Sequence, residues 1–255
     1  GKATTVKDCF LANMVTDVVV QGPANAKTVG ANAEPGAVIA AVGWRAGTKQ
    51  NADGSQQSPG NGVYRSEDGG VSFKNVGLPG ARTIARIIVH PKDPKTAWAA
   101  VMGDLWVPGG SRGLFKTKDG GASWTRVLGA AAPYDDRVGC GDVAIDPGNA
   151  DVLYAALYAR RRTPWSFSFG PAVTDGKDPG GIFKSIDGGA TWTKVTAGLP
   201  KDTGRIGLAV YAKDPRVVYA VVQSDPEGAA GWSVRVKSGG VFRSDDGAGS
   251  FVRVN

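Results

Sequence analysis

The sequence contains one histidine, His90, and two cysteines, Cys9 and Cys140, among 255 residues. A histidine-based catalytic triad and a histidine-cluster metal site both need residues that this chain lacks. We therefore expect no metal and no other cofactor. The cysteines leave two interpretations open, namely two buried thiols or one disulfide that fixes the N-terminal segment.

Long apolar runs and long basic runs are also missing. No stretch approaches the length of a membrane-spanning helix, so we expect no membrane span. The polar start shows no signal peptide and fits a processed mature form, which predicts a secreted or periplasmic protein. The net charge is +7, but the longest basic run is residues 160–162. We therefore expect no nucleic-acid partner.

Glycine and proline, in contrast, are abundant, with 38 and 15 residues respectively. They make up about a fifth of the chain, against roughly an eighth in average proteins. Together with a hydrophobic content of 42%, this excess excludes both a helical bundle and a disordered chain. It predicts many short strands joined by tight turns.

An internal repeat dominates the sequence. Four segments align without gaps: GVYRSEDGGVSF (62–73), GLFKTKDGGASW (113–124), GIFKSIDGGATW (181–192) and GVFRSDDGAGSF (240–251). Each predicts a strand, an Asp-Gly turn that supplies the positive φ of a tight hairpin, and a returning strand. The recurring aspartates are interpreted as structural acceptors of turn hydrogen bonds, because a calcium site needs several carboxylates close together. They are Asp68, Asp119, Asp187 and Asp246.

Two further strand-like runs precede each hairpin. They cover residues 14–20 and 37–45, 84–90 and 96–102, 138–146 and 152–160, and 205–211 and 217–224. Runs such as 97–101 and 218–222 are apolar on both faces, which predicts strands buried on both sides. Four antiparallel strands per repeat describe a β-propeller blade.

The predicted fold is therefore all-β. It is a β-propeller with four four-stranded antiparallel blades carrying Asp-box turns, within one unit that spans residues 1–255. The blades cover about 14–76, 84–128, 138–196 and 204–255, after an N-terminal segment 1–13. We expect these four blades to form part of a larger ring that a second chain or a second copy completes, because an open ring exposes apolar faces. A closed four-bladed ring is the alternative.

The pattern Ser/Thr-x-Asp-x-Gly-x-Ser/Thr-Trp/Phe is the Asp-box, or BNR, motif. Residues 117–124 and 185–192 match it fully, and residues 66–73 match it with Phe73 as the aromatic. Residues 244–251 depart from it at Ala248, where we expect a distorted turn. The chain resembles bacterial BNR-repeat proteins, often labelled glycosyl hydrolases, and more distantly sortilin-type, xyloglucanase and sialidase propellers. The resemblance implies the fold and leaves the activity open.

The residues that perform catalysis in these families lack clear counterparts in this sequence. The early Arg-Ile-Pro motif of sialidases is absent. The resemblance to xyloglucanases implies a catalytic aspartate in the first blade, where residues 43–47 offer no carboxylate. It implies the second in another propeller, for which the chain has no residues.

Loop lengths indicate where a site lies. The loops between second and third strands are the long ones, and they share one end of the blades with the connections between blades, opposite the Asp-box turns. Exposed aromatic and charged side chains on rigid loops suit sugar binding, although the aromatics also suit a purely anchoring role. The candidate ligand-binding residues are Trp106, Tyr134, Arg137, Arg161, Trp165, Phe167 and Trp232.

Glycoside hydrolysis requires a carboxylate pair. The weak catalytic candidates are Asp104, Asp135, Asp136 and Asp175, and no pair stands out among them. Enzyme status therefore stays uncertain, and an enzyme on this scaffold would be a glycoside hydrolase. The first hypothesis is a secreted recognition module that binds glycan or protein through the long-loop end. The alternatives are a BNR-type glycoside hydrolase with catalytic carboxylates partly outside the chain, and a scaffold or assembly subunit.

Overall fold

The chain folds into four antiparallel β-sheets. The computed structural model describes residues 14–21, 37–43, 62–68, 70–104, 106–129, 134, 136–174, 177–224 and 239–255. Residues 14–21 and 37–43 are described by their backbone alone. No helix among the described residues is long and apolar enough to cross a membrane.

In the first, second and fourth sheets, the strands follow one another in chain order. The first sheet contains β1 (Met14–Gln21), β2 (Ala37–Gly43), β3 (Gly62–Ser66) and β4 (Lys74–Asn75). The second contains β5 (Ile84–His90), β6 (Asp93–Val101), β7 (Gly113–Thr117) and β8 (Thr125–Leu128). The fourth contains β14 (Ile206–Val210), β15 (Val218–Val222), β16 (Gly240–Ser244) and β17 (Val252–Arg253).

The third sheet departs from the predicted four strands. It contains β9 (Val138–Ile145), β10 (Leu153–Arg162), β12 (Gly180–Ser185) and β13 (Thr193–Val195), and in addition β11 (Phe167–Phe169). Strand β11 pairs with the end of β10 and leads into a 3₁₀ turn, Gly170–Val173. The segment predicted as a simple long loop is therefore partly a β-ribbon that extends the sheet.

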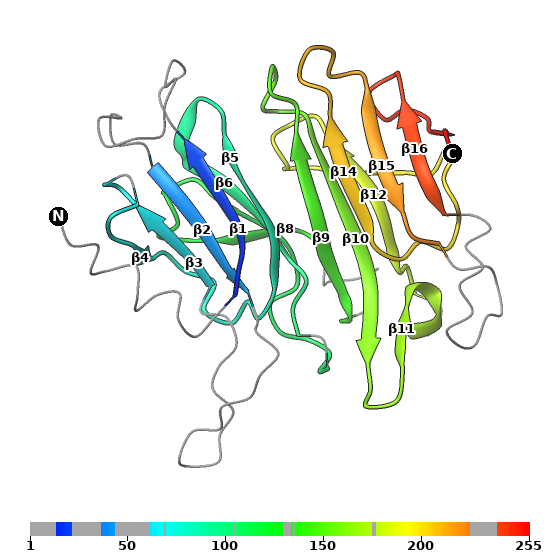
Figure 1. Ribbon diagram of the computed structural model, residues 1–255, viewed down its shortest axis with the longest axis horizontal. Helices are drawn as coiled ribbons and strands as arrows, with labels where there is room; N and C mark the ends of the chain where they lie inside the picture. Colours follow the sequence, from blue (N-terminus) through cyan, green and yellow to red (C-terminus); the bar gives the residue numbers. More distant parts are fainter. Residues whose placement is uncertain are drawn as a thin grey trace.

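The sheets stand side by side along an arc. Strand β1 contacts β5, β5 contacts β9, and β9 contacts β14, so the first strand of each sheet lies against the first strand of the next. Figure 1 shows the first sheet at one side of the molecule, the fourth at the other, and β9 between them. This arrangement confirms the predicted all-β fold and is that of a partial propeller.

Three apolar cores fill the spaces between successive sheets. Successive side chains of a strand point to opposite faces of its sheet. The second strand of a sheet that lies between two others therefore contributes side chains to two cores. In β6, Ala97 and Ala99 face the first sheet, whereas Trp98 and Ala100 face the third. Strand β10 is divided in the same way between the second and fourth sheets.

Strand β15 was predicted to be buried on both faces, and this is wrong. Val218, Ala220 and Val222 pack toward the third sheet, but Tyr219 and Val221 are exposed. The apolar run was correctly identified, yet no sheet among the described residues covers its second face.

Glycine begins the third strand for a steric reason. At Gly113 the backbone φ is +106°, and a Cβ atom would lie 2.3 Å from the carbonyl oxygen of Leu128. Gly62 has the same conformation, with a Cβ position 2.1 Å from the carbonyl oxygen of Gly77. The third strands of the first and second sheets therefore start where the backbone passes too close to a neighbouring carbonyl group for a side chain.

Cys140 lies on β9 and is a buried free thiol. Its Sγ donates to the carbonyl oxygen of Asp142 at 3.3 Å, and burial raises its pKa well above the ordinary range. The interpretation as a buried thiol therefore fits Cys140, whereas Cys9 lies outside the described residues.

Candidate functional site

The two ends of the sheets carry different structures. At one end, the Asp-Gly turns of the second, third and fourth sheets each bond to the first turn of their own sheet. The amides of Gly120, Gly188 and Gly247 donate to the carbonyl oxygens of Lys95, Asp151 and Arg216 at 2.8–2.9 Å. These four hairpin ends, residues 66–73, 117–124, 185–192 and 244–251, are called the Asp-Gly turns below.

At the other end, long loops meet the connections between sheets. The amide of Gly109 donates to the carbonyl oxygen of Asp136 at 2.9 Å, and Arg137 Nη1 donates to that of Val173 at 3.2 Å. This end is called the loop face, and it comprises residues 102–104, 106–112, 134, 136–137, 160–174, 177–180, 202–206 and 223–224. The predicted meeting of long loops and inter-sheet connections is present in the described residues.

The four turn aspartates act as structural acceptors. In the third turn, the Thr191 hydroxyl donates to one oxygen of Asp187 at 2.5 Å, and the Ser185 hydroxyl donates to the other at 2.7 Å. Amides of the turn bond to the same carboxylate, and together these donors hold its pKa well below the usual range. Asp68, Asp119 and Asp246 have matching bonds and the same direction of shift.

The fourth turn was expected to be distorted, and it is not. The amide of Ala248 donates to the Ser244 hydroxyl at 2.8 Å, as the glycine amides do in the other turns. Ala248 reaches this geometry with φ of +62°, a left-handed conformation that costs an alanine about 1–2 kcal/mol. The departure from the motif at Ala248 therefore leaves this hydrogen bond of the turn unchanged.

A buried arginine, which the sequence did not single out, organises the loop of the second sheet. Arg112 is 1% exposed, and its guanidinium donates to several backbone carbonyl oxygens. The acceptors are Met102 at 2.7 Å, Val107 at 2.7 Å, Gly109 at 2.9 Å, and Asp104 at a short distance. Burial, and then the nearby Arg160, lower the pKa of Arg112 to about 10, so it stays charged at neutral pH.

Asp104, a catalytic candidate, is held by its own loop. One carboxylate oxygen accepts the amides of Trp106 and Val107 at 2.7 and 3.1 Å, and the other lies 3.4 Å from Arg82. The carboxylate therefore shapes the loop. Asp136 is exposed, and the candidates Asp135 and Asp175 lie outside the described residues.

The β10–β11 ribbon presents aromatic side chains from a rigid support. Thr163 and Ser166 close its tip with reciprocal backbone bonds and a 2.7 Å bond between their hydroxyls. Trp165, at this tip, is 93% exposed. Its neighbour Arg162 lies over the ring of Trp106 at 5.9 Å, which joins the ribbon to the loop of the second sheet.

One face of the β10–β11 ribbon carries two arginines and two phenylalanines. Arg162 pairs with Phe167, and Arg160 with Phe169, so these four side chains share a face of the ribbon. Arg160 Nη2 donates to the carbonyl oxygen of Gly103 at 3.1 Å, while Phe169 packs against Gly204. The candidates Trp106 and Phe167 are thus both neighbours of Arg162, whereas the exposed Arg161 lies on the opposite side of the ribbon.

Two further ligand-binding candidates, Tyr134 and Arg137, are less exposed than the aromatic residues of the ribbon. The ring of Tyr134 packs edge-on against Phe183 at 5.9 Å, and burial raises its pKa to about 12. Arg137 is half-buried beside the loop of the third sheet. Trp232 lies outside the described residues.

A carboxylate that sequence reasoning missed lies between three sheets. Asp142, on β9, follows a bulge at Gly141 and accepts amides from Val143 at 2.9 Å and Leu208 at 2.8 Å. Arg86 of the second sheet lies 3.9 Å away. Burial raises the pKa of Asp142, although the amides and Arg86 oppose this shift. The available signal was one acid within the otherwise apolar strand VGCGDVAI.

Comparisons with known proteins identify glycoside hydrolases as relatives. No protein-family model matches the chain. A xyloglucanase from a Paenibacillus species is 27% identical over 246 residues, which are 91% of this chain and 20% of that protein. The oligoxyloglucan-reducing end-specific xyloglucanase of Emericella nidulans is 30% identical over 166 residues, which are 60% of this chain and 16% of that protein.

Solved structures show the same fold. An ancestral GH74 enzyme superposes with a TM-score of 0.57 at 19% identity, over 95% of this chain and 24% of that one. The GH74 enzyme of Niastella koreensis gives a TM-score of 0.51 at 14% identity, over 96% of this chain and 30% of that one. The predicted resemblance to glycosyl hydrolase propellers is confirmed at this level. The chain spans a fifth or less of the length of these curated relatives.

Proposed function

We propose that the chain is the propeller part of a glycoside hydrolase that acts on a xyloglucan-type β-glucan, with catalytic carboxylates partly outside these residues. The observation that carries this proposal is the alignment to a protein named xyloglucanase over 91% of the chain. The relatives favour this alternative over the recognition module, which is the first hypothesis from the sequence.

The loop face supplies a surface suited to a glucan chain. Sugar rings stack their apolar faces on exposed aromatic rings, and Trp165, Trp106 and Phe167 are all exposed there. The closed tip at Thr163 and Ser166 fixes the backbone at Trp165, so little backbone entropy is lost on binding. Arg161 and Arg137 are the candidates for hydrogen bonds to sugar hydroxyls.

The carboxylates differ in their suitability for acid–base catalysis. Hydrolysis needs one carboxylic acid and one carboxylate on either side of the glycosidic bond. Asp104 is committed to its loop and to Arg82, so Asp136 is the better of the described candidates. Asp142 has the raised pKa of a general acid, but its bonds to Val143 and Leu208 give it a structural role.

Binding and turnover test this proposal separately. We expect the chain to bind xyloglucan oligosaccharides in titration calorimetry. Release of reducing ends from xyloglucan by the chain alone, lost in Asp136→Asn or Asp135→Asn, would assign a catalytic carboxylate to this chain. Absence of xyloglucan binding would overturn the proposal. Binding of a different glycan class on an array would then favour the recognition module, and no glycan binding at all would favour the scaffold hypothesis.

Two finer assignments belong with this proposal. We propose that the four turns are Asp-boxes of the BNR type, because the hydroxyl, carboxylate and amide bonds recur at corresponding residues. We also propose a secreted or periplasmic location, since a polymeric substrate of this class does not enter cells. Detection of the protein in the culture medium or periplasm tests the location.

A further inference from the structure

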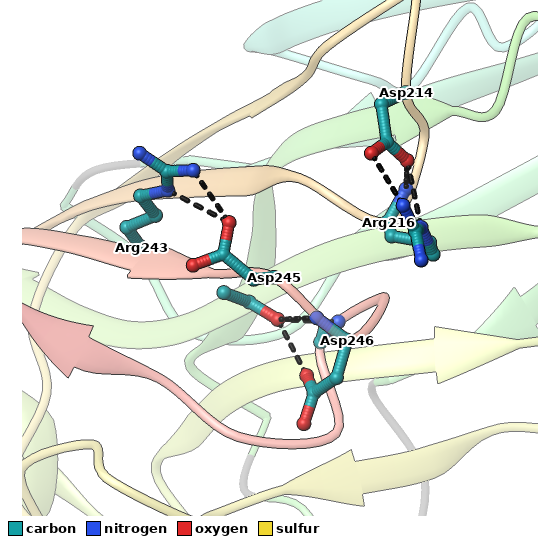
Figure 2. Close-up of polar contacts among 7 residues, drawn as sticks. Asp214, Arg216, Arg243, Asp245 and Asp246 are labelled. Carbon is teal, nitrogen blue, oxygen red and sulfur yellow. Dashed lines mark hydrogen bonds and ion pairs between the residues drawn. The ribbon is translucent and has the colours of Figure 1, made fainter.

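Two arginines of the fourth sheet are each paired with a carboxylate at the end that carries the Asp-Gly turn. Figure 2 shows Arg243 on Asp245, with contacts of 2.6 and 2.9 Å. It also shows Arg216 on Asp214, with contacts of 2.9 and 3.0 Å. The positive charge of these side chains is therefore neutralised by residues of the same turns.

The loop face differs, because several of its arginines have no carboxylate partner. Of the carboxylates on this face, Asp104 lies 3.4 Å from Arg82 and Asp178 lies 2.7 Å from Lys194, so both have other partners. No ion pair within the described part of the chain involves the following four arginines: Arg160, Arg161, Arg162 and Arg205. The loop face therefore carries positive charge that its described carboxylates leave uncompensated.

Aromatic rings lie beside two of these arginines on one face of the β10–β11 ribbon. Arg162 lies 5.9 Å over the ring of Trp106 and pairs with Phe167 across the ribbon. Arg160 pairs with Phe169 in the same way, and the rings of Phe167 and Phe169 are 6.1 Å apart. Guanidinium groups and aromatic rings therefore follow one another along this face.

The same arrangement continues onto the fourth sheet. Phe169 packs against Gly204, where a Cβ atom would lie 2.6 Å from its ring, and Arg205 is the next residue. Burial lowers the pKa of Arg160, and the nearby charge of Arg205 adds to this effect. Arg160 is half-buried and Arg205 is exposed. Two like charges thus lie close together without a carboxylate between them among the described residues, which favours binding of an anion at this point.

These side chains are called the cation–aromatic strip, which consists of Trp106, Arg162, Phe167, Arg160, Phe169 and Arg205. A sugar that carries a carboxylate matches both components of the strip. Its ring presents an apolar face that stacks on aromatic side chains, and its carboxylate accepts two parallel hydrogen bonds from an arginine. A neutral sugar uses the rings but leaves the arginine charges uncompensated. A carboxylate therefore adds an interaction that a neutral sugar lacks.

We propose that the cation–aromatic strip binds a glycan that carries carboxylate groups, with sugar rings on Trp106 and Phe167 and a carboxylate between Arg160 and Arg205. This inference rests on the glycan-binding role proposed above for the loop face, and it specifies an acidic class of ligand. Trp106 and Phe167 are 46% and 37% exposed, so both rings are open to a ligand. The net charge of +7 favours the approach of such a polyanion.

Titration calorimetry with a matched pair of ligands measures this preference. The pair consists of a xyloglucan oligosaccharide and the same oligosaccharide oxidised at its primary hydroxyl groups to carboxylates. We expect the chain to bind the oxidised form about tenfold more tightly at low salt, as one charge-assisted pair provides. The advantage should shrink at high salt, because ions screen the exposed Arg205. Equal affinity for the two forms at low salt would overturn the proposal.

Substitution of one arginine locates the carboxylate. We expect Arg205→Gln to lose most of the tenfold preference for the oxidised oligosaccharide. Arg216→Gln is the matched control, because it removes an exposed arginine at the opposite end of the sheets (Figure 2) and should keep the preference. Circular dichroism verifies that each variant folds. A preference that Arg205→Gln retains in full would overturn the assignment of the carboxylate to this strip.

The same titrations distinguish this inference from the proposed function. Binding of the unmodified oligosaccharide without preference for the oxidised form would overturn the inference and retain the xyloglucan assignment. Binding of the oxidised form alone would retain the strip and overturn the xyloglucan assignment. Aromatic rings interleaved with basic residues also suit single-stranded nucleic acid. A single-stranded oligonucleotide that binds as tightly as the oxidised oligosaccharide and displaces it would overturn the assignment to a glycan.

Discussion

The carboxylate of Asp142 in β9 accepts a 2.8 Å hydrogen bond from the amide of Leu208 in β14. The same carboxylate faces Arg86 of β5 at 3.9 Å, so one side chain joins the second, third and fourth sheets. A bulge at Gly141 sets its direction, because the extra residue shifts the register between β9 and β10. The inner strands are therefore linked by polar bonds as well as by apolar packing.

Asp142 makes stability depend on pH in a defined direction. Burial raises its folded-state pKa, so between the unfolded and folded pKa values the native state binds more protons than the unfolded state. The charged carboxylate costs stability at neutral pH, and the cost is relieved as the pH falls through the folded pKa. We expect the difference in free energy of unfolding between wild type and Asp142→Asn to shift in favour of wild type from pH 7 to pH 4.

Urea denaturation at several pH values measures this shift. Asp151→Asn, which alters an exposed carboxylate of the same sheet, is the control. A difference between wild type and Asp142→Asn that stays constant with pH would mean that the carboxylate is not disfavoured in the folded state.

The strands were predictable because their signals are local. The Asp-Gly turns and apolar runs predict β5 with its observed bounds, and β9 and β14 to within one residue at each end. The start of β6 was missed because Asp93 pairs with His90 inside the predicted turn. The end of β10 was missed because its last residues pair with β11.

The site was less predictable because its contacts are long-range. Arg112 appears in the sequence as one basic residue after a glycine-rich loop, and its role depends on carbonyl groups that the fold brings around it. The contacts of the Asp142 carboxylate depend on a bulge in β9 and on strands of two other sheets. The exposure of Trp165 depends on the pairing of β11, which sequence periodicity over three residues does not reveal.

Arg112 is expected to be essential for the stability of the second sheet. Arg112→Met leaves the carbonyl groups of Met102, Val107 and Gly109 without their buried donor, which costs about 3 kcal/mol or more. Urea denaturation measures the loss. Arg161→Met, which removes an exposed arginine of the loop face, should change the free energy of unfolding little. Equal effects of the two substitutions would refute the role of Arg112 as an internal support of the loop.

Lys184 is expected to stabilise the junction between the third and fourth sheets. Lys184→Met keeps the aliphatic stem but removes the 2.6 Å bond to Gly247 and the contact with Tyr154. We expect a loss of about 1 kcal/mol in the free energy of unfolding. Hydrogen exchange should become faster in β14–β16 while β5–β7 stays protected. The control is Lys213→Met, which changes an exposed lysine of the fourth sheet.

Trp165 offers the sharpest test of the loop face, because its exposure separates binding from stability. Trp165→Ala removes a side chain that is 93% exposed, so the free energy of unfolding should stay unchanged. Loss of one stacking platform should weaken xyloglucan-oligosaccharide binding about tenfold, which corresponds to about 1.4 kcal/mol. The matched control is Tyr211→Ala, which removes an exposed aromatic residue at the end of the sheets that carries the Asp-Gly turns. Equal affinities of wild type and Trp165→Ala would place the glucan elsewhere, and weakening by Tyr211→Ala would move the binding surface to the opposite end of the sheets.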